Sequence, residues 1–82
     1  SNLRDVATPE NEMLSNELKK IVFDTIKGLQ EDLRTAITLR EIEGLSYEEI
    51  AEIMECPVGT VRSRIFRARE IIESKVKPLL QR

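Results

Sequence analysis

Two helical patterns joined by a tight turn occupy the middle of the chain, and they constrain the fold more than any other feature. Ser46 can cap the first helix, and Glu49 stands three residues later, where its carboxylate can bond back to the cap's amide. Leu45 and Ile50 have the spacing of a hydrophobic staple, which sets the angle at which the chain enters the helix. One apolar face is expected from Ile50, Ala51, Ile53 and Met54. Pro57 cannot continue this helix but suits the first turn of the next.

The second helix of the pair carries four arginines within eight residues and has two different faces. At about 100° per residue, an apolar stripe towards the body of the domain is formed by Val61, Ile65, Ala68, Ile72 and Val76. The far side holds Arg62, Ser63, Phe66 and Arg67, together with Gly59. Forked donors, a hydroxyl and one apolar contact are the groups that read base edges in the major groove. Arg64 and Arg69 border the stripe, where they could reach phosphates, so the stretch predicts a DNA-reading helix-turn-helix.

Several side chains in this region allow two interpretations. Phe66 could belong to the core if the helix were rotated by a third of a turn, but that rotation would expose Ile65 or Ile72 to solvent. Tyr47 could offer its hydroxyl to a phosphate or cover the edge of the core with its ring. Arg40 could contact a phosphate, or it could be satisfied by a helix C-terminus and neighbouring acids. Cys56 at the turn is expected to be structural, since the sequence shows no base or second thiol beside it.

The composition indicates one small all-helical domain or a fragment of a larger protein, because charge is high and aromatic residues are few. Because the chain has a single cysteine and no histidine, we expect neither a disulfide nor a metal site. No nucleophile has an evident base and no glycine-rich phosphate loop occurs, so we expect no enzyme, no cofactor and no small-molecule substrate. No signal peptide or membrane-spanning run is visible, which favours a cytoplasmic protein without membrane insertion.

The charge is divided unevenly along the chain. Residues 1–56 carry six basic and thirteen acidic side chains, whereas residues 57–82 carry seven basic and two acidic ones. Because the Debye length is about 8 Å at physiological salt, a DNA surface would respond mainly to the local basic patch. The acidic remainder should weaken non-specific binding and make this domain a weak binder on its own.

The rest of the chain supplies the supporting helices of a domain predicted to span residues 8–82. Residues 1–7 are expected to be a linker or a cloning remnant. A first helix should open at Thr8-Pro9-Glu10 and close at Gly28, and a second should run over residues 30–43 to a left-handed stop at Gly44. The last helix should end at Pro78, with its C-terminal half packed on the first helix. One side of the first helix is apolar. It is expected to pack into the core, or alternatively to dock a partner helix, and it consists of Leu14, Leu18, Ile21, Val22, Thr25, Ile26 and Leu29.

Residues 39–70, LREIEGLSYEEIAEIMECPVGTVRSRIFRARE, resemble region 4 of bacterial RNA polymerase sigma factors, in particular the sigma-E type of the extracytoplasmic-function group. The run GLSYEEIA followed by VGTVRSR is highly specific for that group. A looser likeness extends through residues 31–34 into the first helix and so covers nearly the whole chain. One departure is Gln30, where the family usually has proline, and it touches none of the proposed contacts.

The resemblance implies an all-α, four-helix domain that binds the promoter −35 element through its long last helix. By the family's pattern, bases would be met by Arg62, Ser63, Phe66 and Arg67, and the DNA backbone by Arg40, Tyr47, Thr60, Arg64 and Arg69. The implied partners are promoter DNA, the β flap of the RNA polymerase core and an anti-sigma factor. The region that melts the −10 element is not in this sequence, so we expect a fragment of a two-domain factor that could not initiate transcription alone.

Two other classes of binding module remain as alternatives. The output domains of two-component response regulators are also four-helix readers with a helix-turn-helix, although residues 61–64 with Phe66 suit sigma region 4 better. A purely protein-binding helical domain could instead present its basic face to acidic partners. In that case Arg62 and Arg67 would matter no more than Arg64 and Arg69.

Overall fold

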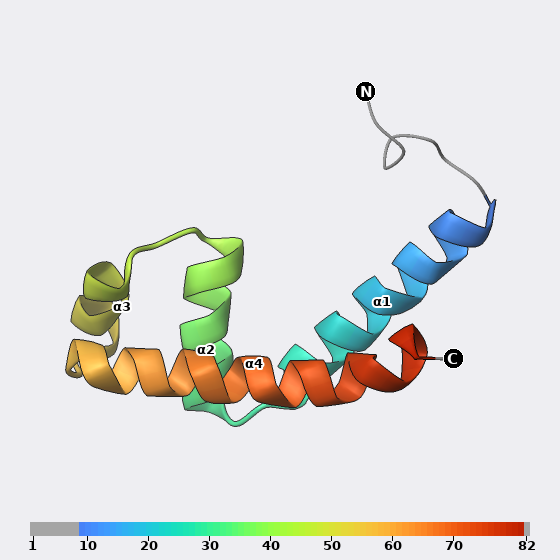
Figure 1. Ribbon diagram of the computed structural model, residues 1–82. Helices are drawn as coiled ribbons and strands as arrows, with labels where there is room; N and C mark the ends of the chain where they lie inside the picture. The colour runs from blue at the N-terminus through green and yellow to red at the C-terminus, as the bar shows by residue number, and fades with distance from the viewer. Residues whose placement is uncertain (1–8, 82) are drawn as a thin grey trace.

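The computed structural model describes residues 9–81, with side chains from Glu12 onward, so the expectation for residues 1–7 lies outside the described part. The described residues contain no strand and confirm the all-α, four-helix prediction. The elements are α1 (Pro9–Gly28), α2 (Glu31–Ile37), the π-helical segment η2 (Thr38–Ile42), α3 (Tyr47–Met54) and α4 (Val58–Leu80). Helices α2 and α3 stand against the N-terminal half of α4, whereas α1 meets α4 with its own C-terminal part and rises away from it at an angle (Figure 1).

The core lies where these helices meet α4. It consists of Leu29, Ala36, Ile37, Ile50, Ala51, Val61, Ile65 and Ala68, all buried. The α4 members are three of the five residues of the predicted stripe, and the other two, Ile72 and Val76, are partly buried. The predicted orientation of α4 is therefore confirmed.

The prediction that Pro78 ends the last helix is wrong, because α4 continues through Leu80. Proline has no N–H to donate to the carbonyl one turn earlier, but its fixed φ suits a helix, and only two helical residues follow it. Leu79 is 8% exposed, and Gln81 donates its N–H to the Lys77 carbonyl at 3.1 Å. Burial of the leucine and this hydrogen bond stabilise the turn that contains the proline.

The predicted helix over residues 30–43 is shorter and changes its winding. The α-helical part ends at Ile37, and η2 follows with the wider i to i−5 bonding, shown by the Glu43 N–H donating to the Thr38 carbonyl at 3.1 Å. The Leu45 N–H then donates to the Leu39 carbonyl at 3.0 Å. Gly44 has a φ of 75°, so the predicted left-handed stop is confirmed.

Helix α3 begins with the predicted capping box. The Glu49 N–H donates to Ser46 Oγ at 3.0 Å, and the Ser46 N–H donates to Glu49 Oε1 at 2.8 Å. The bond from the Ser46 backbone, with a smaller contribution from its side chain, lowers the pKa of Glu49. Ile50 is fully buried, but Ile53 is 57% exposed, contrary to the prediction. Ile53 lies at the edge of the apolar face, and an eight-residue helix packed on one side leaves that edge uncovered.

The turn between α3 and α4 contains a strained position that invites a stability test. Glu55 has a left-handed backbone, with φ 54° and ψ 51°, which is costly for a residue that bears a Cβ. We expect Glu55→Gly to raise the free energy of unfolding by about 0.5–1 kcal/mol. The matched control Glu52→Gly, inside α3, should lower it by about 1 kcal/mol. Thermal and urea denaturation would measure both, and equal losses in the two variants would contradict the assignment of strain.

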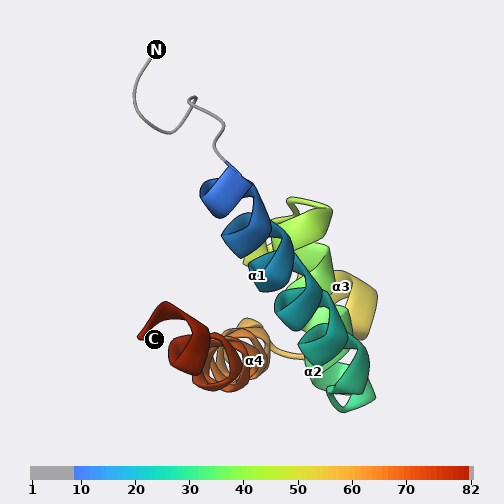
Figure 2. The same ribbon diagram turned by 90° about the vertical axis from the view of Figure 1, so that its right-hand side faces the viewer.

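Helix α1 packs on the domain through only part of its predicted apolar face. Ile26 is partly buried against the core, whereas Leu14 is 36% exposed. The first turns of α1 extend beyond the other helices (Figure 1 and Figure 2). Met13 and Phe23, which were not part of that face, are exposed. The core interpretation is therefore right for Ile26 and Leu29 and wrong for Leu14.

Candidate nucleic-acid interface

The N-terminal half of α4 presents all four predicted base-reading side chains to solvent. Arg62, Ser63, Phe66 and Arg67 are exposed, while Val61 and Ile65 on the same turns are buried. Phe66 is 65% exposed, so the alternative that placed it in the core is wrong. An exposed aromatic ring flanked by arginines on a protruding helix can contact a thymine methyl while its neighbours donate to base edges.

Arg67 has one weak partner within its own helix. Its Nη1 lies 3.6 Å from Glu70 Oε1, and both side chains are about half or more exposed. Exposed pairs of this kind contribute at most about 1 kcal/mol. The guanidinium of Arg67 can therefore leave Glu70 for a base or phosphate at little cost.

The two border arginines of α4 are held by acids from α2 and η2. Arg64 Nε lies 3.6 Å from Asp32 Oδ2, and its Nη1 lies 3.6 Å from the Cys56 sulfur. Arg69 donates from Nε and Nη2 to Glu41 Oε2. The hydrogen bond to Glu41 raises the pKa of Arg69 above its usual value, and Tyr47 adds to the shift in the same direction. Any phosphate contact by Arg64 or Arg69 would have to compete with these carboxylates.

Tyr47, the first residue of α3, brings together side chains from three elements. Its ring is partly buried against the core, as the second interpretation of this residue proposed. Arg40 of η2 places Cζ 4.7 Å from the ring centroid, and Arg62 of α4 places Cζ 5.6 Å from it. Arg40 also donates from Nη1 to the Leu45 carbonyl at 2.8 Å, just beyond the end of its helix. Arg62 therefore leans towards α3 and does not point straight outward.

Thr60, the remaining predicted backbone contact, lies in the first turn of α4 and is partly exposed. Its N–H donates to the Pro57 carbonyl at 3.0 Å. Pro57 itself has an extended ψ of 151° and caps α4 from outside, one residue earlier than its predicted place in the first turn. The start of the helix is thus closed by backbone bonding, and the Thr60 side chain is left at the rim of the interface.

The two acids that restrain the border arginines could not be predicted from the sequence. Asp32 and Glu41 are 32 and 28 residues away from Arg64 and Arg69 in the chain. No helical period or motif relates positions so far apart. Only the packing of α2 and η2 on α4 brings them together.

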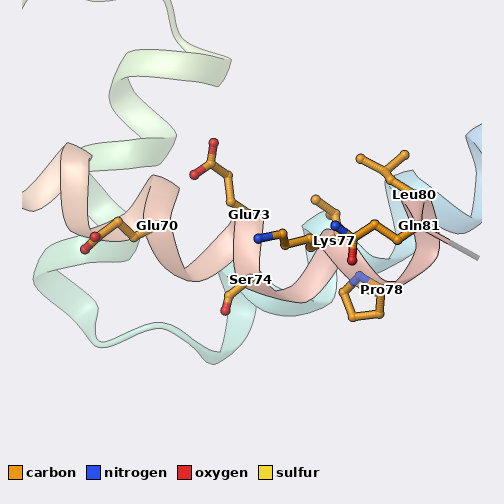
Figure 3. Close-up of a pocket in the computed structure, with 8 residues that line it drawn as sticks. Glu70, Glu73, Ser74, Lys77, Pro78, Leu80 and Gln81 are labelled. Carbon is orange, nitrogen blue, oxygen red and sulfur yellow. The ribbon is translucent and has the colours of Figure 1, made fainter.

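A shallow hollow at the other end of α4 does not belong to this interface. It is lined from one helix and its C-cap, by Glu70, Glu73, Ser74, Val76, Lys77, Pro78, Leu80 and Gln81 (Figure 3). The labelled side chains leave the helix in different directions, and none of the four residues predicted to read bases is among them. Among the helices of the described residues, none is long and apolar enough to cross a membrane.

Comparison with known proteins agrees with the geometry of α3 and α4. The chain matches the family described as Sigma-70, region 4, over residues 19–72, which include α3, the turn and the part of α4 that carries the candidate interface. A Haemophilus influenzae protein named ECF RNA polymerase sigma-E factor is 78% identical over 80 residues, which are 98% of this chain and 42% of that protein. Proteins of the same name from Salmonella typhimurium and Escherichia coli K12 are 70% identical over the same shares.

The chain therefore spans less than half the length of these relatives. The family match covers more than half of the chain, from the middle of α1 to the middle of α4. It contains every residue of the candidate interface, and it favours the sigma-factor interpretation over the response-regulator alternative. On this evidence the chain belongs to the Sigma-70 region 4 family.

Proposed function

We propose that this chain binds the promoter −35 element sequence-specifically, as the region 4 domain of a sigma factor that directs RNA polymerase to initiate transcription. Base edges are read by Arg62, Ser63, Phe66 and Arg67, and the DNA backbone is contacted by Arg40, Tyr47, Thr60, Arg64 and Arg69. The observation that supports this most is the outer face of α4. It exposes Phe66 among arginines while the opposite face of the same turns is completely buried.

The proposal is tested by binding of the chain to two labelled duplexes at several salt concentrations. One duplex carries a GGAAC-type −35 element and the other carries the same base pairs in shuffled order. A preference for the first that persists as salt rises is expected, because base contacts do not depend on counterion release. Equal and steeply salt-sensitive binding to both duplexes would leave only a basic patch and would overturn the proposal.

The acids that hold the border arginines lead to a separate prediction. Removing one carboxylate with Glu41→Gln or Asp32→Asn frees a guanidinium for phosphate and lowers repulsion of the DNA. We expect each variant to bind both duplexes more tightly, by roughly two- to five-fold at low salt, with the gain shrinking as salt rises. The control Glu12→Gln changes the net charge equally but lies in the protruding turns of α1, so it should have a smaller effect.

A gain in Glu12→Gln equal to that in the other two variants would show that net charge, and not release of the arginines, causes the tighter binding. A gain confined to the −35 duplex would also contradict the prediction, since phosphates carry no sequence information. Fluorescence anisotropy titrations at three salt concentrations would measure all of these affinities.

Partners and location follow from the same proposal. The family and the names of the relatives support association with RNA polymerase. Docking on the β flap of the core enzyme and sequestration by an anti-sigma factor belong to the same proposal and rest on the resemblance of residues 39–70 alone. The chain would act in the cytoplasm, where transcription takes place. It would contribute binding and positioning, with no catalytic step or cofactor of its own.

A further inference from the structure

Two arginines approach the ring of Tyr47, one that is held by a hydrogen bond to the backbone and one that belongs to the candidate base-reading face. Arg40 is fixed on one side by its hydrogen bond to the Leu45 carbonyl, immediately before the capping box of α3. Arg62 extends from α4 over the same ring at 5.6 Å. A cation within about 6 Å of a ring centroid is attracted by the negative face of the ring.

Arg62 differs from the other arginines of this part of α4 in the charge of its partner. Within the described residues, Arg64, Arg67 and Arg69 each pair with a carboxylate, and Arg69 interacts with Tyr47 as well, whereas Arg62 contacts the ring of Tyr47. A carboxylate neutralises a guanidinium and must be displaced before the group can bind DNA. A ring restrains the side chain while its donors and its charge stay available.

The ring is itself well placed to act as a fixed support. Tyr47 is the first helical residue after the Ser46 cap, and the capping box sets the backbone there. Its ring packs against the core, and Arg40 covers it from η2. A long arginine side chain loses rotamer freedom when it binds, so a preformed orientation reduces the cost of forming a bidentate contact.

We propose that Tyr47 is a positioning residue, whose ring orients Arg62 for base recognition, while its hydroxyl is dispensable for that role. This rests on the proposed function, in which Arg62 reads a base. It predicts that specificity for the base pair read by Arg62 depends on the aromatic face at position 47. The other base pairs of the −35 element should depend on it much less.

The experiment measures the ratio of the dissociation constants for the shuffled and −35 duplexes in the chain and its variants. Tyr47→Leu should lower the ratio roughly five-fold, and Tyr47→Phe should leave it within about two-fold of the original. In an Arg62→Ala background, Tyr47→Leu should produce no further loss, whereas in an Arg67→Ala background its loss should be unchanged. Thermal unfolding checks that each variant is folded. A fluorinated phenylalanine at position 47 is a further variant, because fluorine weakens the attraction of the ring face for a cation while the ring keeps nearly the same shape.

Single base-pair substitutions complete the test. The position at which Tyr47→Leu and the fluorinated ring lose discrimination should be the one at which Arg62→Ala loses it. An unchanged ratio in Tyr47→Leu, an equal loss in Tyr47→Phe, or a full loss in the Arg62→Ala background would each overturn the inference. If Tyr47→Leu does not fold, an unchanged ratio with the fluorinated ring would overturn it. The original chain showing no preference between the duplexes would instead overturn the proposed function.

Discussion

Replacing Ile65 with alanine should lower the free energy of unfolding by about 2–5 kcal/mol, enough to unfold much of a domain of this size. Ile65 is 1% exposed and lies on the face of α4 that packs against the core. Its truncation removes buried methyl groups and leaves a cavity that neighbouring helices can fill only partly. Urea denaturation followed by circular dichroism would measure the loss.

The adjacent residue provides the matched control. Phe66 is larger but 65% exposed, so Phe66→Ala should change the free energy of unfolding by no more than about 0.5 kcal/mol. The same variant should weaken binding to the −35 duplex, since its ring belongs to the proposed contact face. A larger loss of stability in Phe66→Ala than in Ile65→Ala would show that the orientation of α4 is wrong.

Arg67→Ala should cost about 1–3 kcal/mol of binding free energy on the −35 duplex and much less on the shuffled one. The bidentate contact to a guanine edge is lost only where the correct base is present, and the exposed pair with Glu70 offers little compensation. Titrations of both duplexes at matched salt would measure the difference. Equal losses on the two duplexes would remove Arg67 from the base-reading set.

Arg69→Ala is the control for the electrostatic part of binding. It should weaken binding to both duplexes alike and reduce the slope of log K against log salt by about one. The size of this effect depends on the hydrogen bonds to Glu41, because in the protein without DNA the Glu41 carboxylate already neutralises part of the Arg69 charge. If Arg67→Ala changed the ratio between the duplexes no more than Arg69→Ala does, the protein-binding alternative would gain support.

Much of the fold could be predicted because the signals are local. A capping box relates residues three positions apart, and a helical stripe relates residues three or four apart, so Ser46, Glu49 and the α4 stripe were placed correctly. The errors came where tertiary packing overrides a local preference. Pro78 stays in a helix that buries Leu79, and the π-helical segment replaces the end of a predicted α-helix.

The candidate site also has one part that could be predicted from the sequence and one part that could not. Exposure of Arg62, Ser63, Phe66 and Arg67 follows from their angles around α4, which periodicity determines. The roles of these residues, and of the predicted backbone contacts, remain predictions. Their immediate partners could not be predicted, since Asp32, Glu41 and Tyr47 come from other elements and approach α4 only after folding.

The sequence by itself determined that the chain forms four helices, which face of α4 is buried and which family the chain resembles. These properties depend on spacings within a single helix or on short motifs, which the order of residues states directly. The tertiary structure alone decided that Arg64 and Arg69 are held by acids while Arg62 rests on the ring of Tyr47. The reason is geometric, because the packing of three helices on α4 sets distances between side chains that are 15 to 32 residues apart.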